Sequence, residues 1–105
     1  RQTSQILKNI NKKTKLIICT HLGGWPCDMN KIKKIIKKRK ILIIEDCSQA
    51  HGAMINNKYV GSFGDISVWS FCNDKIMSTL GEGGMISCKS KKLYKVLNIN
   101  LKCLS

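Results

Sequence analysis

Residues 15–20 read KLIICT and residues 41–44 read ILII, and the basic segment DMNKIKKIIKKR lies between them at residues 28–39. The two apolar runs have the length of strands, and unbroken runs of this kind are typical of parallel strands buried on both faces. The basic segment has apolar residues three or four positions apart, which predicts an amphipathic helix with Asp28 as its N-cap. Strand, helix and strand in this order predict a βαβ unit with a right-handed crossover.

The second half of the chain predicts more strands, separated by turns. An Asn-Asn pair at residues 56–57 lies between short apolar pairs, so we expect residues 53–61 to form a hairpin. Residues 65–71 and 85–88 have strand composition, and we expect the last strand to run antiparallel to its neighbour. Together these elements predict an α/β fold, a three-layer sandwich with a mixed, mostly parallel sheet. A final helix is predicted from Lys91, with four apolar residues on its inner face: Leu93, Val96, Leu97 and Leu101.

The composition is that of an ordinary globular protein. The chain has 105 residues, of which 43% are hydrophobic and 24% charged, and this length allows one domain at most. No apolar run approaches the roughly 18 residues of a membrane span, and the N-terminal region lacks a signal-peptide pattern. We therefore expect a cytoplasmic protein with no membrane contact. Because the chain begins with Arg1 and ends at Ser105 inside a predicted helix, we also expect it to be part of a longer protein.

The net charge of +13 raises the question of nucleic-acid binding, since clustered lysines neutralise phosphates. The charge is uneven, because residues 41–88 carry −3 and the remaining segments carry all of the excess. Only two of the 19 basic residues are arginine, on which specific nucleic-acid sites usually draw. We interpret the lysines of residues 31–40 and 89–95 as solvated helix faces. A small basic module that binds nucleic acid through residues 31–40 is the rival hypothesis.

The cysteines predict a reducing environment and no metal site. No two of the six have the C-x-x-C spacing of a zinc or redox centre, and several lie in apolar, strand-like context, where cysteine behaves as a small hydrophobic residue. They are Cys19, Cys27, Cys47, Cys72, Cys88 and Cys103. We expect them to be reduced, as in a cytosolic protein.

Chemistry in an open α/β sheet is expected beyond the carboxyl ends of the strands. Polar residues follow three of the predicted strands: His21; Glu45, Asp46, Ser48, Gln49 and His51; and Ser70, Asn73, Asp74 and Lys75. A lysine and an aspartate at adjacent strand ends could serve a carbonyl cofactor, the lysine as a Schiff base and the aspartate beside a protonated pyridine nitrogen. Spacing alone indicates this only weakly, because a lysine after a strand is usually a solvated loop residue and an aspartate there is often a helix cap.

Four motifs make the interpretation more specific. Residues 43–53 (IIEDCSQAHGA), residues 60–66 (VGSFGDI) and residues 70–76 (SFCNDKI), followed by GEGG at residues 81–84, strongly resemble signatures of the DegT/DnrJ/StrS-type sugar aminotransferases. The HLGG sequence of residues 21–24 is similar to an earlier strand end in this family. The motifs stand in the family's order and cover nearly the whole chain.

The resemblance implies a pyridoxal 5′-phosphate enzyme of the fold-type I aminotransferases. Lys75 matches the lysine that forms the Schiff base and then moves the proton, and Asp46 matches the carboxylate at the pyridine nitrogen. Gln49 matches a glutamine beside the cofactor ring, and Ser70 matches a serine that hydrogen-bonds the phosphate. The ordinary alternatives are a surface lysine, a helix cap, a polar loop residue and a strand serine bonded to backbone. Neither His21 nor His51 is given a role.

The resemblance also implies a reaction and its partners. The intact protein would move an amino group, from glutamate, to a keto group of a nucleotide-linked sugar for amino-sugar or polysaccharide biosynthesis, as a homodimer. A cyclitol or another ketone is the alternative substrate. A dehydratase branch of the family has histidine in place of the lysine, so Lys75 argues against that branch. Asn73 and Asp74 depart from the commoner Pro-Thr before the lysine, which leaves the substrate open.

Residues 1–105 would form the central part of the cofactor-binding large domain. The family's upstream segment, with a phosphate-binding turn at a helix start, and its C-terminal small domain have no counterpart in this sequence. We therefore expect the chain alone to be inactive.

Overall fold

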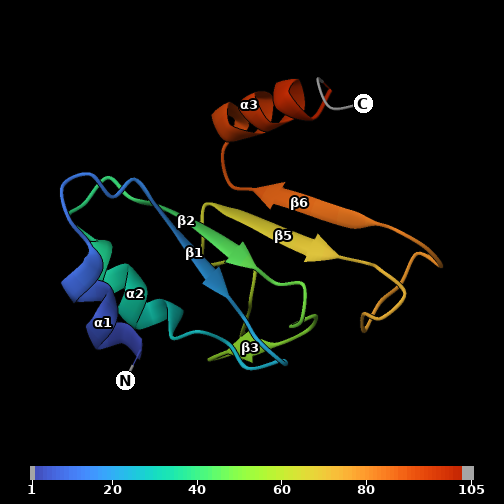
Figure 1. Ribbon diagram of the computed structural model, residues 1–105, viewed down its shortest axis with the longest axis horizontal. Helices are drawn as coiled ribbons and strands as arrows, with labels where there is room; N and C mark the ends of the chain where they lie inside the picture. The colour runs from blue at the N-terminus through green and yellow to red at the C-terminus, as the bar shows by residue number, and fades with distance from the viewer. Residues whose placement is uncertain (1, 103–105) are drawn as a thin grey trace.

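A four-stranded sheet forms the centre of the molecule (Figure 1). The computed structural model describes residues 2–102, and the side chains of residues 5–98. The strand order is β1-β2-β5-β6, with β1 at Leu16–Thr20, β2 at Leu42–Asp46, β5 at Ile66–Ser70 and β6 at Gly84–Cys88. The first three strands are parallel and β6 is antiparallel to β5. This confirms the mixed, mostly parallel sheet.

Two helices, α1 (Gln2–Asn9) and α2 (Met29–Ile36), pack against one face of the sheet (Figure 1). Asp28 caps α2 by accepting a hydrogen bond from the Lys31 amide at 3.0 Å, as predicted. The helix ends at Ile36 and not near residue 39, because the Arg39 amide bonds to the Ile36 carbonyl in a tighter turn. The main core lies between helices and sheet and consists of Cys19, Met29, Ile32, Ile36, Ile41, Ile43 and Phe63.

Strand β2 extends two residues further than the apolar run predicts. Glu45 and Asp46 keep the strand register, opposite Cys19 and Thr20 of β1, and they also pair with β5. Both carboxylates therefore lie at the end of the strand itself and not in the loop that follows. Because side chains alternate along a strand, they point to opposite faces of the sheet.

The predicted hairpin is present as β3 (Met54–Ile55) and β4 (Lys58–Tyr59). Asn56 and Asn57 have φ angles of 48° and 60°, the left-handed values that a two-residue hairpin turn requires. The hairpin adjoins a second apolar cluster, formed by Cys47, Ala50 and Val60, with Trp69 packed against it.

Helix α3 (Lys91–Lys102) lies on the β6 side of the sheet, away from α1 and α2 (Figure 1). Leu93 and Leu97 are partly buried, but Val96 is 51% exposed, so its predicted inward position is wrong for this structure. The reason is that only one side of the helix contacts β6. The side chain of Leu101 lies outside the described residues.

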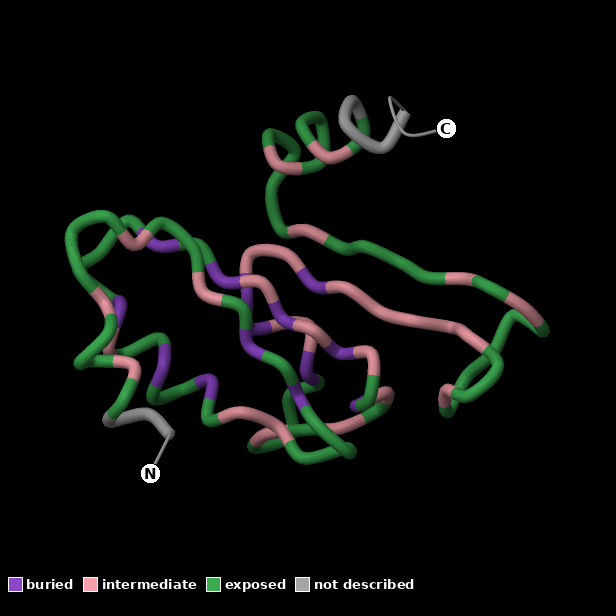
Figure 2. The backbone as a smooth tube through the Cα atoms, viewed as in Figure 1, coloured by how far each residue is buried: buried purple, intermediate pink, exposed green. Residues whose placement is uncertain are grey.

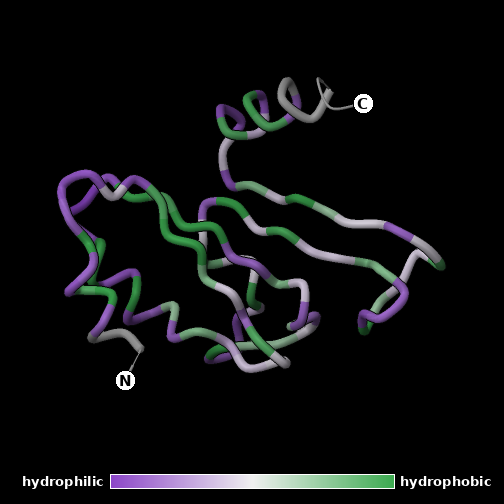
Figure 3. The backbone as a smooth tube through the Cα atoms, viewed as in Figure 1, coloured by the Kyte–Doolittle hydropathy of each residue, from purple (hydrophilic) through white to green (hydrophobic). Residues whose placement is uncertain are grey.

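Apolar side chains remain exposed on the outer strands and the loops. In Figure 2 the exposed residues run along β6 and α3, and Figure 3 shows hydrophobic residues along β1 and the start of β2, with hydrophilic residues at the end of β2. Ile18 of β1 is 62% exposed, and Leu16 and Leu42 are exposed beside it on the face opposite α1 and α2. Among the described residues, no helix has the length and apolar character needed to cross a membrane.

Candidate active site

Asp46 and Ser70 end adjacent parallel strands. Asp46 lies opposite Val68 in the register, and Ser70 is two residues further along β5, so both side chains point to the face opposite α1 and α2. Asp46 Oδ1 accepts a hydrogen bond from the Ser48 amide at 3.1 Å, and Ser70 Oγ accepts one from the Cys72 amide at 3.4 Å. Each side chain thus shapes the loop that follows its strand.

Gln49 joins the loop after β2 to the loop after β1. Its side-chain Oε1 accepts a hydrogen bond from the Gly23 amide at 3.1 Å, and its carbonyl accepts one from the Gly24 amide at 2.7 Å. These two glycines have φ angles of 56° and 77°, which a residue with a Cβ rarely adopts. Their turn therefore presents two consecutive amides to Gln49.

Lys75 lies in the irregular loop between β5 and β6. Its ammonium donates a hydrogen bond to Asp74 Oδ2 at 3.0 Å, and the two side chains are 21% and 73% exposed. This hydrogen bond, together with the positive charge, lowers the pKa of the Asp74 carboxyl below its ordinary value. The amine of Lys75 is the more sheltered member of the pair.

A pocket of about 380 Å³ brings Lys75 and Gln49 together. Its walls come from the loops after β1, β2 and β5: Gly23, Gly24, Ser48, Gln49, Asp74, Lys75 and Ile76. Asp46 and Ser70 are not among these residues and lie on the adjoining sheet face. The structure therefore places two of the four predicted residues in one cavity and the other two at the same edge of the sheet.

Glu45, which the sequence places only among the polar residues after the second strand, is a buried carboxylate. It is 0% exposed, and Oε2 accepts hydrogen bonds from His21 Nε2 at 3.0 Å and from the Gly61 amide at 2.7 Å. Oε1 accepts hydrogen bonds from the amides of Phe63, at 2.7 Å, and Gly64. We call Glu45, His21, Gly61, Phe63 and Gly64 the Glu45 cluster. Glycines three positions apart, directly before β5, are the signal in the sequence that could have indicated it.

The hydrogen bonds of the Glu45 cluster keep the carboxylate ionised. Burial alone would raise the pKa of Glu45, but the hydrogen bonds from His21 and three backbone amides outweigh burial and lower this pKa. His21 Nδ1 accepts a hydrogen bond from the Cys27 amide at 3.0 Å, so the ring proton is on Nε2, which donates to Glu45.

Donor atoms of His21, Glu45 and Cys47 lie within 4.8 Å of one another, a grouping that could hold a metal ion. Both nitrogens of His21 and both oxygens of Glu45 are already engaged in hydrogen bonds. Burial, followed by the charges of Glu45 and Asp46, raises the pKa of the Cys47 thiol to about 12, which disfavours the thiolate that metals bind. We interpret the group as a hydrogen-bonded cluster.

His51 lies behind Ser70. Its Nε2 donates a hydrogen bond to the Ser70 carbonyl at 3.0 Å, and its ring lies 5.5 Å from that of Trp69 and 5.7 Å from that of Phe71. Nδ1 is buried and has no hydrogen-bond partner among the described residues. His51 therefore supports the end of β5 and does not line the pocket of Lys75.

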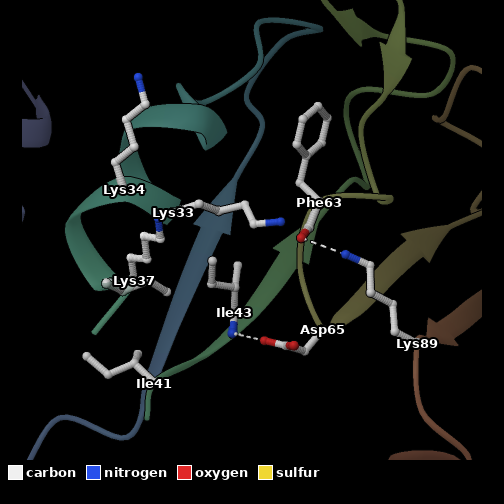
Figure 4. A pocket seen from close by; sticks show the side chains of 9 residues that line it. Lys33, Lys34, Lys37, Ile41, Ile43, Phe63, Asp65 and Lys89 are labelled. Carbon is white, nitrogen blue, oxygen red and sulfur yellow. Dashed lines mark hydrogen bonds between the residues drawn. The ribbon is translucent and has the colours of Figure 1, made fainter. Parts of the chain in front are cut away.

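A second pocket, of about 450 Å³, lies at the amino ends of β2 and β5 (Figure 4). Lysines surround an apolar floor that includes Ile43 and Phe63, and the Lys89 ammonium donates a hydrogen bond to the Phe63 carbonyl at 2.8 Å. Burial and then the nearby Lys33 and Lys58 lower the pKa of Lys89. None of the four predicted site residues lines this pocket.

The sequence profile of the DegT/DnrJ/EryC1/StrS aminotransferase family matches residues 2–102. The chain belongs to this family. The four motifs predicted this membership, and it is confirmed.

Two relatives are named for nucleotide-linked amino sugars. GDP-perosamine synthase of Escherichia coli O157:H7 is 50% identical over 91 residues, which is 87% of this chain and 25% of the relative. The dTDP-3-amino-3,6-dideoxy-alpha-D-galactopyranose transaminase of Aneurinibacillus thermoaerophilus is 44% identical over 95 residues, 90% of this chain and 26% of the relative. The chain thus spans about a quarter of the length of these relatives.

Solved structures share the fold. The structure of GDP-4-keto-6-deoxy-D-mannose-3-dehydratase of E. coli with bound hydrated PLP superposes with a TM-score of 0.84 at 32% identity. The match covers 90% of this chain and 24% of the dehydratase. This likeness confirms the predicted fold class.

Proposed function

We propose that residues 1–105 are the central part of the large domain of a pyridoxal 5′-phosphate-dependent aminotransferase. The main observation in support is the pocket that is lined by both Lys75 and Gln49. The pocket lies beside the sheet edge at which β2 ends with Asp46 and β5 ends with Ser70. The family membership and the coverage of about a quarter of each relative support this proposal. Below, "the whole protein" means the product of the longest reading frame that contains these residues. A reading frame that encodes these 105 residues and nothing more would contradict the proposal.

The residues present fit this cofactor. A sheltered primary amine, Lys75, faces a pocket, and a carboxylate and a hydroxyl project from neighbouring strand ends on one face of the sheet. Asp46 would hold the ring nitrogen in its protonated form, Gln49 would lie beside the ring and Ser70 would donate to the phosphate. When bound, the cofactor supplies a ring that accepts the electrons released from the substrate.

Lys75 would carry the proton transfer. Its amine would anchor the cofactor covalently and, once released, would move a proton at the substrate carbon. Asp74 accepts its hydrogen bond in the present arrangement and is the residue that would orient this amine. A histidine at this position would lack the primary amine that an anchoring bond requires. The lysine therefore favours aminotransfer over the dehydration carried out by the dehydratase of similar fold.

We further propose that the substrate is a keto sugar linked to a nucleoside diphosphate, with glutamate as amino donor. The relatives described above act on GDP- and dTDP-linked sugars, so the shared chemistry is the keto sugar on a diphosphate. A cyclitol ketone is the alternative. A panel of GDP-, dTDP- and UDP-linked keto sugars and a keto-inositol, each with glutamate, tests this choice through the amino product formed.

We propose a homodimer that acts in the cytoplasm. Ile76 and Leu80, in the loop with Lys75, are 70% and 95% exposed, and apolar side chains of this kind are usually covered by a partner or another segment. The cysteines of the described residues are free, as expected in a reducing compartment. Sedimentation of the whole protein tests the dimer.

The experiment that tests the cofactor and its lysine is chemical trapping. The whole protein, purified with pyridoxal phosphate, is treated with borohydride, digested and mapped by mass spectrometry. We expect the reduced cofactor on the peptide that contains Lys75, and we expect Lys75→Ala to lose the absorbance of lysine-bound cofactor. Lys92→Ala, on the exposed side of α3, is the matched control and should retain it. Absence of cofactor, or a label on another lysine, would overturn the assignment.

A further inference from the structure

We infer that His21 and Glu45 are positioning residues, which hold the carboxyl ends of β1 and β2 in the arrangement that binds the cofactor. This inference rests on the function proposed above. Both side chains are 0% exposed, so neither can touch a ligand in the pocket of Lys75. Any influence on the site must pass through the segments that they hold.

Glu45 connects three separate segments of the chain. Glu45 itself belongs to β2, and it accepts a hydrogen bond from His21, which lies just beyond β1. It also accepts hydrogen bonds from backbone amides of the 61–64 segment, which leads into β5. Of the predicted site residues, Asp46 ends β2 and Ser70 ends β5. A carboxylate suits this position because each oxygen receives two N–H donors, and an ionised carboxylate accepts without donating.

Space around Glu45 is as restricted as its hydrogen bonds. A Cβ on Gly64 would lie 2.9 Å from the Ile43 carbonyl oxygen and 3.2 Å from Glu45 Cγ. The 61–64 segment can therefore approach the carboxylate only because position 64 has no side chain. The close approach delivers the Phe63 and Gly64 amides to the same oxygen.

His21 connects the Glu45 carboxylate to the turn that binds Gln49. His21 Nε2 donates a hydrogen bond to Glu45, and Nδ1 accepts one from the Cys27 amide. The ring therefore cannot rotate without losing both hydrogen bonds. The His21 amide also donates to the Asp46 carbonyl at 3.0 Å. Gly23 and Gly24 follow within three residues and donate to Gln49. The path from Glu45 to Gln49 therefore runs through His21 and one short turn.

Asp46 is affected more directly, because it is the next residue after Glu45. The two carboxylates point to opposite faces of one strand end, so a shift of the Glu45 carboxylate moves the backbone that carries Asp46. Weaker cofactor binding is the expected consequence of a disturbed Glu45 cluster, with the fold otherwise retained.

Glu45→Gln in the whole protein tests the inference. The amide NH₂ must replace one oxygen that receives two N–H donors, so two donors lose their acceptor. Asp65→Asn is the matched control, since Asp65 accepts the Ile43 amide at 2.8 Å at the opposite end of the same strands. The readouts are the dissociation constant of pyridoxal phosphate, measured by titration of the apoprotein well below its melting temperature, and the melting temperature itself.

We expect Glu45→Gln to weaken cofactor binding on the order of tenfold and Asp65→Asn to leave it unchanged, because the asparagine oxygen can still accept the Ile43 amide. Equal cofactor affinities in the two variants would overturn the inference. If Glu45→Gln does not fold, a comparison of His21→Gln with His21→Ala tests the inference instead. The glutamine side chain can still donate a hydrogen bond to Glu45, so the His21→Gln variant should bind the cofactor more tightly than the His21→Ala variant. Equal binding by these two would also overturn it. Wild-type protein that binds no cofactor would instead refute the proposed function.

Discussion

The two sides of the candidate active site are built differently. Asp46 and Gln49 lie on strand ends and turns that are joined by buried hydrogen bonds of the Glu45 cluster and by the Gly23–Gly24 turn. Lys75 lies in a loop whose neighbouring apolar residues are exposed, and its ammonium bonds to a carboxylate that is itself mostly exposed. The chain therefore holds the side with Asp46 and Gln49 by its own contacts, whereas the side with Lys75 has few contacts of its own.

This difference has a physical cause. Parallel strands bring their carboxyl ends to one edge, and hydrogen bonds between strand ends are buried and shielded from water there. The 71–83 loop connects antiparallel strands and bends away from the helices, so its side chains meet solvent in the described structure. We propose that a partner subunit or other parts of the whole protein cover this loop.

The largest effect is expected on the lysine side, and it concerns activity and not stability. Lys75→Ala should lower the turnover number at least about 100-fold, because it removes the amine that we propose as the proton carrier. The free energy of unfolding should change by less than about 1 kcal/mol, since the ion pair with Asp74 is at the surface. Steady-state kinetics and urea denaturation measure the two. A large loss of stability would show that the loop is held as firmly as the Asp46 side.

On the Glu45 side, the largest expected effect is on stability. Gly64→Ala places a Cβ against the Ile43 carbonyl and should destabilise the protein by about 1–3 kcal/mol. Gly81→Ala, in the lysine loop, is the control, because its Cβ meets nothing within 4 Å. Thermal unfolding of both variants of the whole protein tests the contrast, and similar melting temperatures would remove it.

The pH dependence of stability should distinguish the two sides next. The folded pKa of Glu45 is lowered, so its ionised form stabilises the fold above the ordinary glutamate pKa of 4.5, and this contribution is lost as the pH falls through the folded pKa. The advantage of the wild type over Glu45→Gln in unfolding free energy should therefore shrink from pH 7 to strongly acidic pH. Denaturant titrations at both pH values measure it. A constant difference would contradict the assigned charge state.

The smallest effect is expected far from both sides. Asp28→Ala removes the N-cap of α2 and should cost about 1 kcal/mol without changing cofactor affinity. Because α2 packs on the helix-covered face, away from Asp46 and Lys75, weaker cofactor binding in this variant would show that the site is sensitive to stability in general. Cofactor titration and thermal unfolding of the same preparation provide both readouts.

Much of the fold could be predicted from local patterns. The apolar runs of β1 and β2, the cap at Asp28 and the Asn-Asn turn each depend on a few neighbouring residues, and each is present in the structure. The errors occurred where partners are distant. Strand β2 continues through two acidic residues because its neighbouring strands supply pairing, and Val96 stays exposed because α3 meets little more than β6.

The candidate site divides in the same way. The motifs around Asp46, Gln49, Ser70 and Lys75 are short segments, so the order of residues was enough to indicate the family and its chemistry. The Glu45 cluster joins residues 16 to 24 positions apart, and no local pattern states which donors will meet a buried carboxylate. The sequence by itself determines which reactive side chains are present and in what order. Only the tertiary structure determines which buried hydrogen bonds hold those side chains in place, because burial and hydrogen bonding depend on neighbours in space and not along the chain.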